Sequence, residues 1–164
     1  MTEFSMLVNR ASCFGCQTCE VACKQENRLG IGPRWIRVIE IGPEKIGGVL
    51  KMSYWPMRCL HCSKPPCHGV CPTEAIYKRK DGIVLINSAL CSGCKACIDA
   101  CPFGALQWNP ETKSVGKCTL CVHRVDKGLE PACVAACPTR AIYFGDINQL
   151  AELKRKDSGN SVFW

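Results

Sequence analysis

Residues 91–102 read CSGCKACIDACP. Two residues separate the first cysteine from the second and the second from the third, three residues separate the third from the fourth, and a proline follows the fourth. Three thiolates spaced in this way can hold one face of a [4Fe-4S] cluster, and the fourth cysteine of such a run ligates a different cluster. Gly93 supplies the tight turn that lets backbone N–H groups point at the cluster sulfurs. The stretch therefore predicts an iron-sulfur site.

Variants of this run occur four times and use every cysteine of the chain. The four motifs are Cys13, Cys16, Cys19 and Cys23; Cys59, Cys62, Cys67 and Cys71; Cys91, Cys94, Cys97 and Cys101; and Cys118, Cys121, Cys133 and Cys137. A proline follows the last cysteine of the second, third and fourth motifs, and only Cys23 lacks one. Sixteen cysteines in four sets of four match the ligand count of four [4Fe-4S] clusters.

Disulfides and structural zinc are the two alternative uses of these cysteines. Disulfide frameworks are typical of secreted chains, but residues 1–5 contain neither the basic nor the apolar segment of a secretion signal. Zinc could bind four thiolates such as those of the fourth motif. Zinc ribbons, however, pair two separated CxxC sequences and need neither a third cysteine three residues on nor a final proline. We therefore expect clusters, and no folded state without them.

The formal net charge of +7 suggests a nucleic-acid-binding protein. Each oxidised [4Fe-4S] cluster with four thiolates carries about −2, however, so four clusters nearly cancel this charge and no nucleic-acid partner is expected. The basic residues closest to the motifs are interpreted as counter-charges to the clusters, with simple solvation as the alternative for each. They are Arg58, Lys95, Lys117 and Arg124. No stretch of eighteen apolar residues is present, so no membrane span is expected.

An internal repeat indicates how the motifs are entered. Residues 7–16 (LVNRASCFGC) resemble residues 85–94 (LINSALCSGC), so a strand followed by the same loop is expected before the first and third motifs. The other expected elements are a strand over residues 4–8, a helix over 20–27, strands over 34–41 and 49–54 joined by a loop of several residues, a hairpin turning at 81–82, a strand over 142–144, a helix over 147–156 and a tail over 157–164.

The order of strands and motifs predicts an α+β fold of two nested dicluster-ferredoxin-like units with little hydrophobic core. The second and third motifs fit one such unit without interruption, whereas the first has only the leading strand and the fourth only the closing strand. We expect an outer unit over residues 1–57 and 107–164, which carries the hairpin at 34–54 and the C-terminal helix, and an inserted unit over residues 58–106. A tandem arrangement, with motif one paired to two and three to four, is the alternative.

Several short segments resemble those of one known family. They are residues 56–62 (PMRCLHC), 65–67 (PPC), 117–121 (KCTLC) with Arg124, 130–133 (EPAC) and 144–146 (FGD). Over residues 4–150 the chain resembles the four-cluster iron-sulfur subunits that accompany molybdenum or tungsten pterin oxidoreductases, as in the dimethyl sulfoxide reductase, polysulfide reductase and formate dehydrogenase groups. The resemblance implies an electron-transfer subunit that changes no substrate bond and conveys single electrons between a catalytic partner and a second redox module or carrier.

The resemblance also implies which cysteines share a cluster. The four implied sets are Cys13, Cys16, Cys19 and Cys137; Cys59, Cys62, Cys67 and Cys101; Cys91, Cys94, Cys97 and Cys71; and Cys118, Cys121, Cys133 and Cys23. Family members arrange their four clusters in a row, as a path for electrons. Three histidines, His61, His68 and His123, lie beside cysteines and are interpreted as packing or N–H···S partners.

The chain is shorter than the larger family members and is similar in size to the small polyferredoxin subunits of cytoplasmic tungsten-containing aldehyde oxidoreductases and benzoyl-CoA reductase complexes. The expected partners are a catalytic tungsten- or molybdenum-pterin subunit and a flavin- or NAD-linked redox subunit, in a cytoplasmic hetero-oligomer of anaerobic metabolism. A hydrogenase or formate-linked complex is the alternative partner, and export on a signal-bearing partner is the alternative location. A zinc-stabilised binding module and a redox-sensing regulator are the other functional classes considered.

Overall fold

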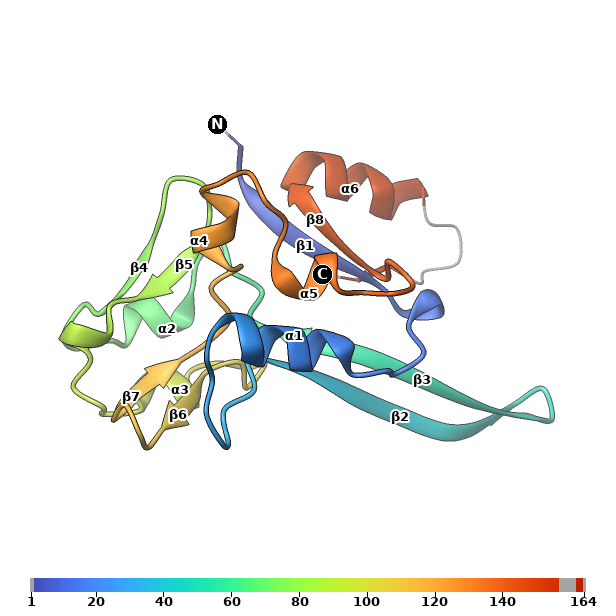
Figure 1. Cartoon of the computed structure of the whole chain (residues 1–164), viewed down its shortest axis with the longest axis horizontal. Coiled ribbons are helices and arrows are strands. Elements are labelled where there is room, and N and C mark those ends of the chain that lie inside the picture. Colours follow the sequence, from blue (N-terminus) through green and yellow to red (C-terminus); the bar gives the residue numbers. More distant parts are fainter. Residues whose placement is uncertain (1, 157–161, 164) are drawn as a thin grey trace.

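The computed structural model of the chain describes residues 2–156 and 162–163 (Figure 1). Its strands are β1 (Phe4–Asn9), β2 (Ile36–Ile46), β3 (Val49–Arg58), β4 (Ile76–Lys78), β5 (Val84–Ile86), β6 (Gln107–Asn109), β7 (Ser114–Gly116), β8 (Ile142–Asp146) and β9 (Val162–Phe163). Its α-helices are α1 (Thr18–Glu26), α2 (Pro66–Gly69), α3 (Ala96–Asp99), α4 (Val122–Val125), α5 (Ala132–Ala135) and α6 (Ile147–Lys156). Short strands and mostly single-turn helices joined by loops confirm the α+β class.

The strands of the described residues form four small antiparallel sheets. The largest has the order β8-β1-β9, and its register places Met6 opposite Phe144. β1 precedes the first cysteine motif and β8 follows the fourth, so the two ends of the chain meet in one sheet. Helix α6 packs on this sheet, where Leu150 and Leu7 form a buried apolar contact. The prediction of a tail over residues 157–164 is wrong at residues 162–163, which form β9 and pair with β1. The other residues of that segment, 157–161 and 164, lie outside the described residues.

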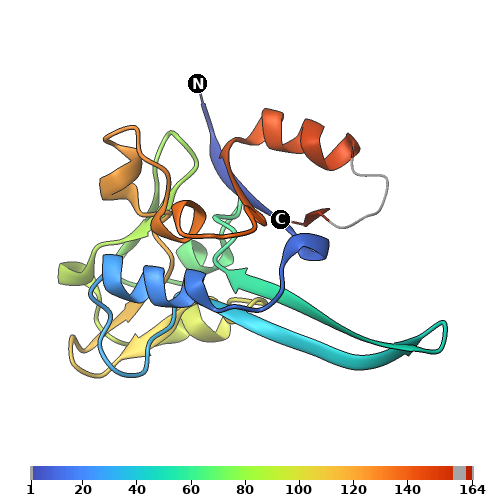
Figure 2. The same cartoon turned by 45° about the vertical axis from the view of Figure 1, so that its right-hand side comes forward.

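Strands β2 and β3 form a long hairpin that projects from the rest of the molecule in both views (Figures 1 and 2). The strands are longer than expected and the loop is shorter. Gly47 and Gly48 alone connect them, with φ of 59° and 84°, because two residues with positive φ make the tight turn that matches the twist of a hairpin. Gly42 and Pro43, expected in the loop, lie instead within β2, where a bulge shifts the register between Ile41 and Glu44.

Cysteines and apolar side chains share the core. The larger buried group combines Ile36, Ile83 and Leu120, each at most 2% exposed, with Cys19, Cys23, Cys59, Cys118 and Cys133. A second buried group surrounds Cys67 and Cys97. The hairpin β6–β7, which the sequence pattern did not predict, packs against this second group through Val115 and Trp108. No helix among the described residues has the length and apolar character needed to cross a membrane.

Candidate metal centres

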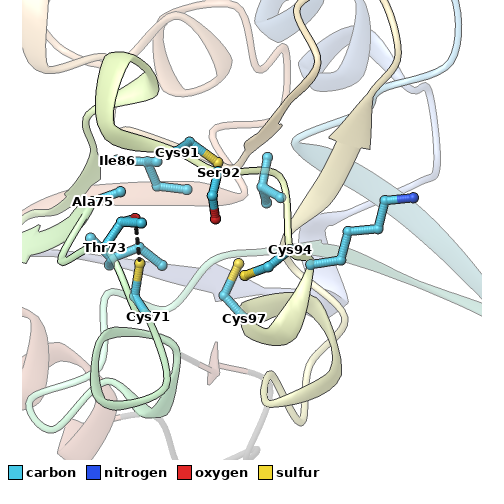
Figure 3. A pocket seen from close by; sticks show the side chains of 11 residues that line it. Cys71, Thr73, Ala75, Ile86, Cys91, Ser92, Cys94 and Cys97 are labelled. Carbon is cyan, nitrogen blue, oxygen red and sulfur yellow. Dashed lines mark hydrogen bonds between the residues drawn. The ribbon is translucent and has the colours of Figure 1, made fainter.

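Within the described residues, the sixteen cysteines line four cavities of similar size. The space free of atoms in and around each cavity, including solvent at its mouth, amounts to about 280–350 Å³. We name them the Cys16 cavity (Cys13, Cys16, Cys19, Cys137), the Cys121 cavity (Cys23, Cys118, Cys121, Cys133), the Cys62 cavity (Cys59, Cys62, Cys67, Cys101) and the Cys94 cavity (Cys71, Cys91, Cys94, Cys97). Each cavity combines cysteines of two motifs. In the Cys94 cavity the four sulfurs point toward a common space (Figure 3). Cluster ligation by these cysteines stays a prediction.

The repeated sequence produces the same loop at two cavities. The side chain of Asn9 accepts a hydrogen bond from the backbone N–H of Ala11, and that of Asn87 accepts one from Ala89, so each caps a short 3₁₀ turn that delivers the next cysteine. Gly15 and Gly93 then have φ of +76° and +74°. Helices α1 and α3 carry the third cysteine of the first and third motifs. Each follows a residue with a left-handed backbone conformation, Gln17 before α1 and Lys95 before α3. The expected repeat of geometry is confirmed.

Several N–H groups point at cysteine sulfurs. The backbone N–H of His61 donates to Cys59 Sγ at 3.4 Å, that of Leu120 to Cys118 Sγ at 3.4 Å, and that of Ala141 to Cys137 Sγ at 3.3 Å. Donors of this kind stabilise the anionic sulfurs of an iron-sulfur centre and tune its potential. The loops are therefore shaped to receive thiolates.

Asn27 is a functional candidate that the sequence analysis missed. Its Nδ2 lies 3.7 Å from Cys23 Sγ and 3.9 Å from Cys121 Sγ, and it also donates to the Cys23 carbonyl at 2.9 Å. The spacing of four residues from Cys23 places the two on one face of the turn at the end of α1. That spacing was available in the sequence, whereas the contact with Cys121, 94 residues away, was not.

The cysteines are arranged in sets of four, without disulfides among the described residues. All sixteen cysteines lie in the described part of the chain, and none forms a disulfide. Among the described residues, no group of three or more histidine, cysteine, aspartate or glutamate side chains could hold one metal ion. A tetrahedral zinc site requires four sulfurs about 2.3 Å from one centre. Four thiols that line one common cavity leave room for a larger inorganic group.

Several buried thiols are difficult to ionise in the absence of a positive partner. Burial, followed by repulsion from neighbouring cysteines, raises the pKa of Cys19 to about 12. The same two causes raise the pKa of Cys23 and Cys133, and burial is the main cause that raises the pKa of Cys118 to about 11. Metal binding requires the thiolate form and displaces these protons. Thiolates at these buried positions consequently require positive charge close to them.

The cavities follow one another in a row. Cys19 of the Cys16 cavity and Cys23 of the Cys121 cavity stand one turn apart on α1 and interact electrostatically. Cys118 of the Cys121 cavity interacts in the same way with Cys59 of the Cys62 cavity, and Cys67 of that cavity with Cys97 of the Cys94 cavity. The order is therefore Cys16, Cys121, Cys62, Cys94. The two exposed cysteines, Cys16 and Cys94, belong to the two ends of the row.

The four cations singled out from the sequence have different environments. Arg58 and Lys117 are each 2% exposed. Lys95 is exposed, with its Nζ 4.6 Å from the centre of the Trp108 ring. Arg124 forms an ion pair of 3.2 Å with Glu26. Proximity to cysteine in the sequence thus does not distinguish buried charges from peripheral ones.

The three histidines also differ in burial and in their hydrogen-bond partners. His61 is buried, and its Nδ1 accepts a hydrogen bond of 2.9 Å from the backbone N–H of Val84. Burial and the nearby Lys117 and Arg58 hold the pKa of His61 well below its usual range, so the ring is neutral. His123 Nε2 lies 2.7 Å from Glu26 Oε1, and His68 is exposed. The His61 backbone, and not its ring, supplies the N–H···S contact.

Comparison with known proteins agrees with this geometry. A family model described as a 4Fe-4S dicluster domain matches residues 50–147, and a second model with the same description matches residues 12–75. The B subunit of polysulfide reductase from Wolinella succinogenes is 42% identical over 89% of this chain and 78% of its own length. The B subunit of anaerobic dimethyl sulfoxide reductase from Escherichia coli is 37% identical over 91% of this chain and 76% of its own length. The thiosulfate reductase electron transfer subunit of Salmonella typhi is 38% identical over 93% of this chain and 80% of its own length. The protein therefore belongs to the 4Fe-4S dicluster family, among the iron-sulfur electron-transfer subunits of reductase complexes.

Proposed function

We propose that the chain relays single electrons along the row of four cavities between a catalytic molybdenum- or tungsten-pterin subunit and a second redox subunit or carrier. The observation that supports this is the row itself, whose two ends carry the exposed Cys16 and Cys94. When bound, a [4Fe-4S] cluster would supply a centre that gains and loses one electron. The loops of this chain position the cysteine thiolates and point backbone N–H groups at their sulfurs, and the surrounding fold shields the inner sites from water.

The proposed ligands are the cysteines that line each cavity. They are Cys13, Cys16, Cys19 and Cys137; Cys23, Cys118, Cys121 and Cys133; Cys59, Cys62, Cys67 and Cys101; and Cys71, Cys91, Cys94 and Cys97. Each cavity draws on motifs one and four together or on motifs two and three together. This pairing, with the β1–β8 sheet, supports the nested units over residues 1–57 with 107–164 and over 58–106, and disfavours the tandem arrangement.

Both ends of the row offer apolar surface to a partner. Phe14, which lines the Cys16 cavity, is 56% exposed. Leu90, which directly precedes Cys91 of the Cys94 cavity in the sequence, is 51% exposed. Large exposed apolar side chains next to a redox site are suited to close, water-excluding contact with another subunit. We accordingly propose one redox partner at each end of a hetero-oligomer. Tungsten as the metal of the catalytic partner, a flavin- or NAD-linked subunit and a cytoplasmic location stay predictions.

Metal analysis of the complex, purified anaerobically from its native host, tests the proposal. We expect about sixteen iron atoms per chain, broad visible absorption, and molybdenum or tungsten in the same fractions. The same iron content with nickel would retain the electron relay and replace the pterin partner by a hydrogenase. About four zinc atoms per chain with no iron and no visible absorption would refute the electron relay altogether.

A further inference from the structure

Two cations, Arg58 and Lys117, lie inside the protein beside the inner cavities. The Nζ of Lys117 donates to the backbone carbonyls of Val84 and of Cys118, the latter at 3.0 Å. The Arg58 Nη2 donates to the Met6 carbonyl at 2.6 Å, and its Nε contacts Met6 Sδ at 3.2 Å. The third guanidinium nitrogen of Arg58, Nη1, is buried and has no hydrogen-bond partner among the described residues. Both side chains are thus fully enclosed by the fold.

Neither buried cation has an acidic partner. In the described part of the chain, no carboxylate oxygen lies within 4.0 Å of the charged nitrogens of Arg58 or Lys117. Other basic side chains do form such pairs, including Arg34 with Glu20 and Arg79 with Asp126, although both of those arginines are partly exposed. An unpaired charge inside a protein is strongly unfavourable. The counter-anion must therefore come from another group.

Both cations contact residues of the two inner cavities, whose cysteines would be thiolates with a cluster bound. Arg58 lines the Cys121 cavity and interacts electrostatically with Cys118 and Cys133. The Lys117 Nζ donates to the carbonyl of Val84, which lines the Cys62 cavity together with Cys62 and Cys67. Its second acceptor is the carbonyl of Cys118, which lines the Cys121 cavity. Arg58 and Lys117 therefore place their positive charges at the two inner cavities of the row, the Cys121 and Cys62 cavities.

We infer that Arg58 and Lys117 are the buried counter-charges of the two inner clusters and raise the reduction potentials of those clusters. The inference rests on the proposed function. Reduction adds one negative charge to a cluster, and a fixed cation stabilises that charge strongly where water is excluded. Lys95 carries the same charge next to the Cys94 cavity, but water and salt screen it. Burial of the charge, and not its place in the sequence, makes it effective.

Redox titration of the full chain, monitored by electron paramagnetic resonance, tests this inference. We expect Lys117→Met and Arg58→Met each to shift the midpoint potential of one or both inner clusters to more negative values. A tenfold fall in the equilibrium constant for reduction, which corresponds to about 59 mV for one electron, is the minimum effect expected. Lys95→Met is the matched control, and it should shift its cluster by less. Lys117→Arg and Arg58→Lys keep the charge and should keep the potentials near those of the parent.

The outcomes separate this inference from the proposed function. Loss of iron from the Met variants, together with full iron in the charge-conserving variants, would also support a required counter-charge. Four intact clusters with unshifted potentials in both Met variants, or equal shifts in the neutral and charge-conserving variants, would overturn the inference and leave the electron relay standing. A parent chain that binds zinc and shows no paramagnetic signal on reduction would overturn both.

Discussion

The repeat allows one substitution to be compared at two equivalent positions. Gly15 and Gly93 occupy the same place in the first and third motifs and have nearly the same φ, +76° and +74°. An alanine Cβ at residue 15 would lie 2.4 Å from two ring carbons of Tyr54, whereas one at residue 93 would approach the Trp108 ring no closer than 3.1 Å. Both substitutions strain the backbone, and only the first collides with a side chain that must swing away.

The structure therefore ranks the two variants. A left-handed conformation costs an alanine about 1–2 kcal/mol, and this cost is common to Gly15→Ala and Gly93→Ala. Overpacking against Tyr54 adds a further cost of about 1–3 kcal/mol to Gly15→Ala alone. Since each 1.4 kcal/mol corresponds to about a tenfold change in an equilibrium, Gly15→Ala should populate the opened loop roughly 5- to 140-fold above Gly93→Ala.

The assay is the rate at which an iron chelator bleaches the visible absorption of each anaerobically purified variant, because cluster release follows the population of the opened loop. Bleaching should be faster in Gly15→Ala than in Gly93→Ala, and faster in both than in the parent. Adding Tyr54→Ala to Gly15→Ala removes the collision and should return the rate toward that of Gly93→Ala. Equal rates for the two glycine variants, or no recovery relative to Tyr54→Ala alone, would show that the collision does not control the loop.

Two further predictions concern helix α1. Cys23→Ala should remove about four of the sixteen iron atoms, those of the Cys121 cavity, and leave the paramagnetic signal of the Cys16-cavity cluster largely intact; loss of the Cys16-cavity signal alone would contradict the proposed sharing of ligands. Glu20→Gln should destabilise the fold by about 1–1.5 kcal/mol, because the buried Glu20 carboxylate accepts the Val38 N–H at 2.5 Å and pairs with Arg34, and a glutamine amide keeps an acceptor but loses the charge. A lower temperature for loss of visible absorption checks the second prediction, and Glu152→Gln on the exposed face of α6, which should leave that temperature unchanged, is its control.

Much of each cysteine loop could be predicted from the sequence. Asn9 and Asn87, Gly15 and Gly93, and the prolines after Cys71, Cys101 and Cys137 act on neighbours a few residues away. Over such short distances the covalent chain leaves few conformations, so residue type and spacing predict the geometry. The same reasoning failed in the β2–β3 hairpin, where four turn-forming residues were present and only the pair at 47–48 makes the turn.

The sequence by itself determined the number of cysteine sites, their local loops and, through its similarity to known proteins, the family. Tertiary structure decided which of the cations beside cysteine are buried: Lys117 and Arg58 are enclosed, while Lys95, which also adjoins a cysteine in the sequence, is exposed. It also decided the order of the cavities and the reach of Asn27 to Cys121. Burial and contacts between distant motifs depend on how all segments pack together, and no local spacing contains that information.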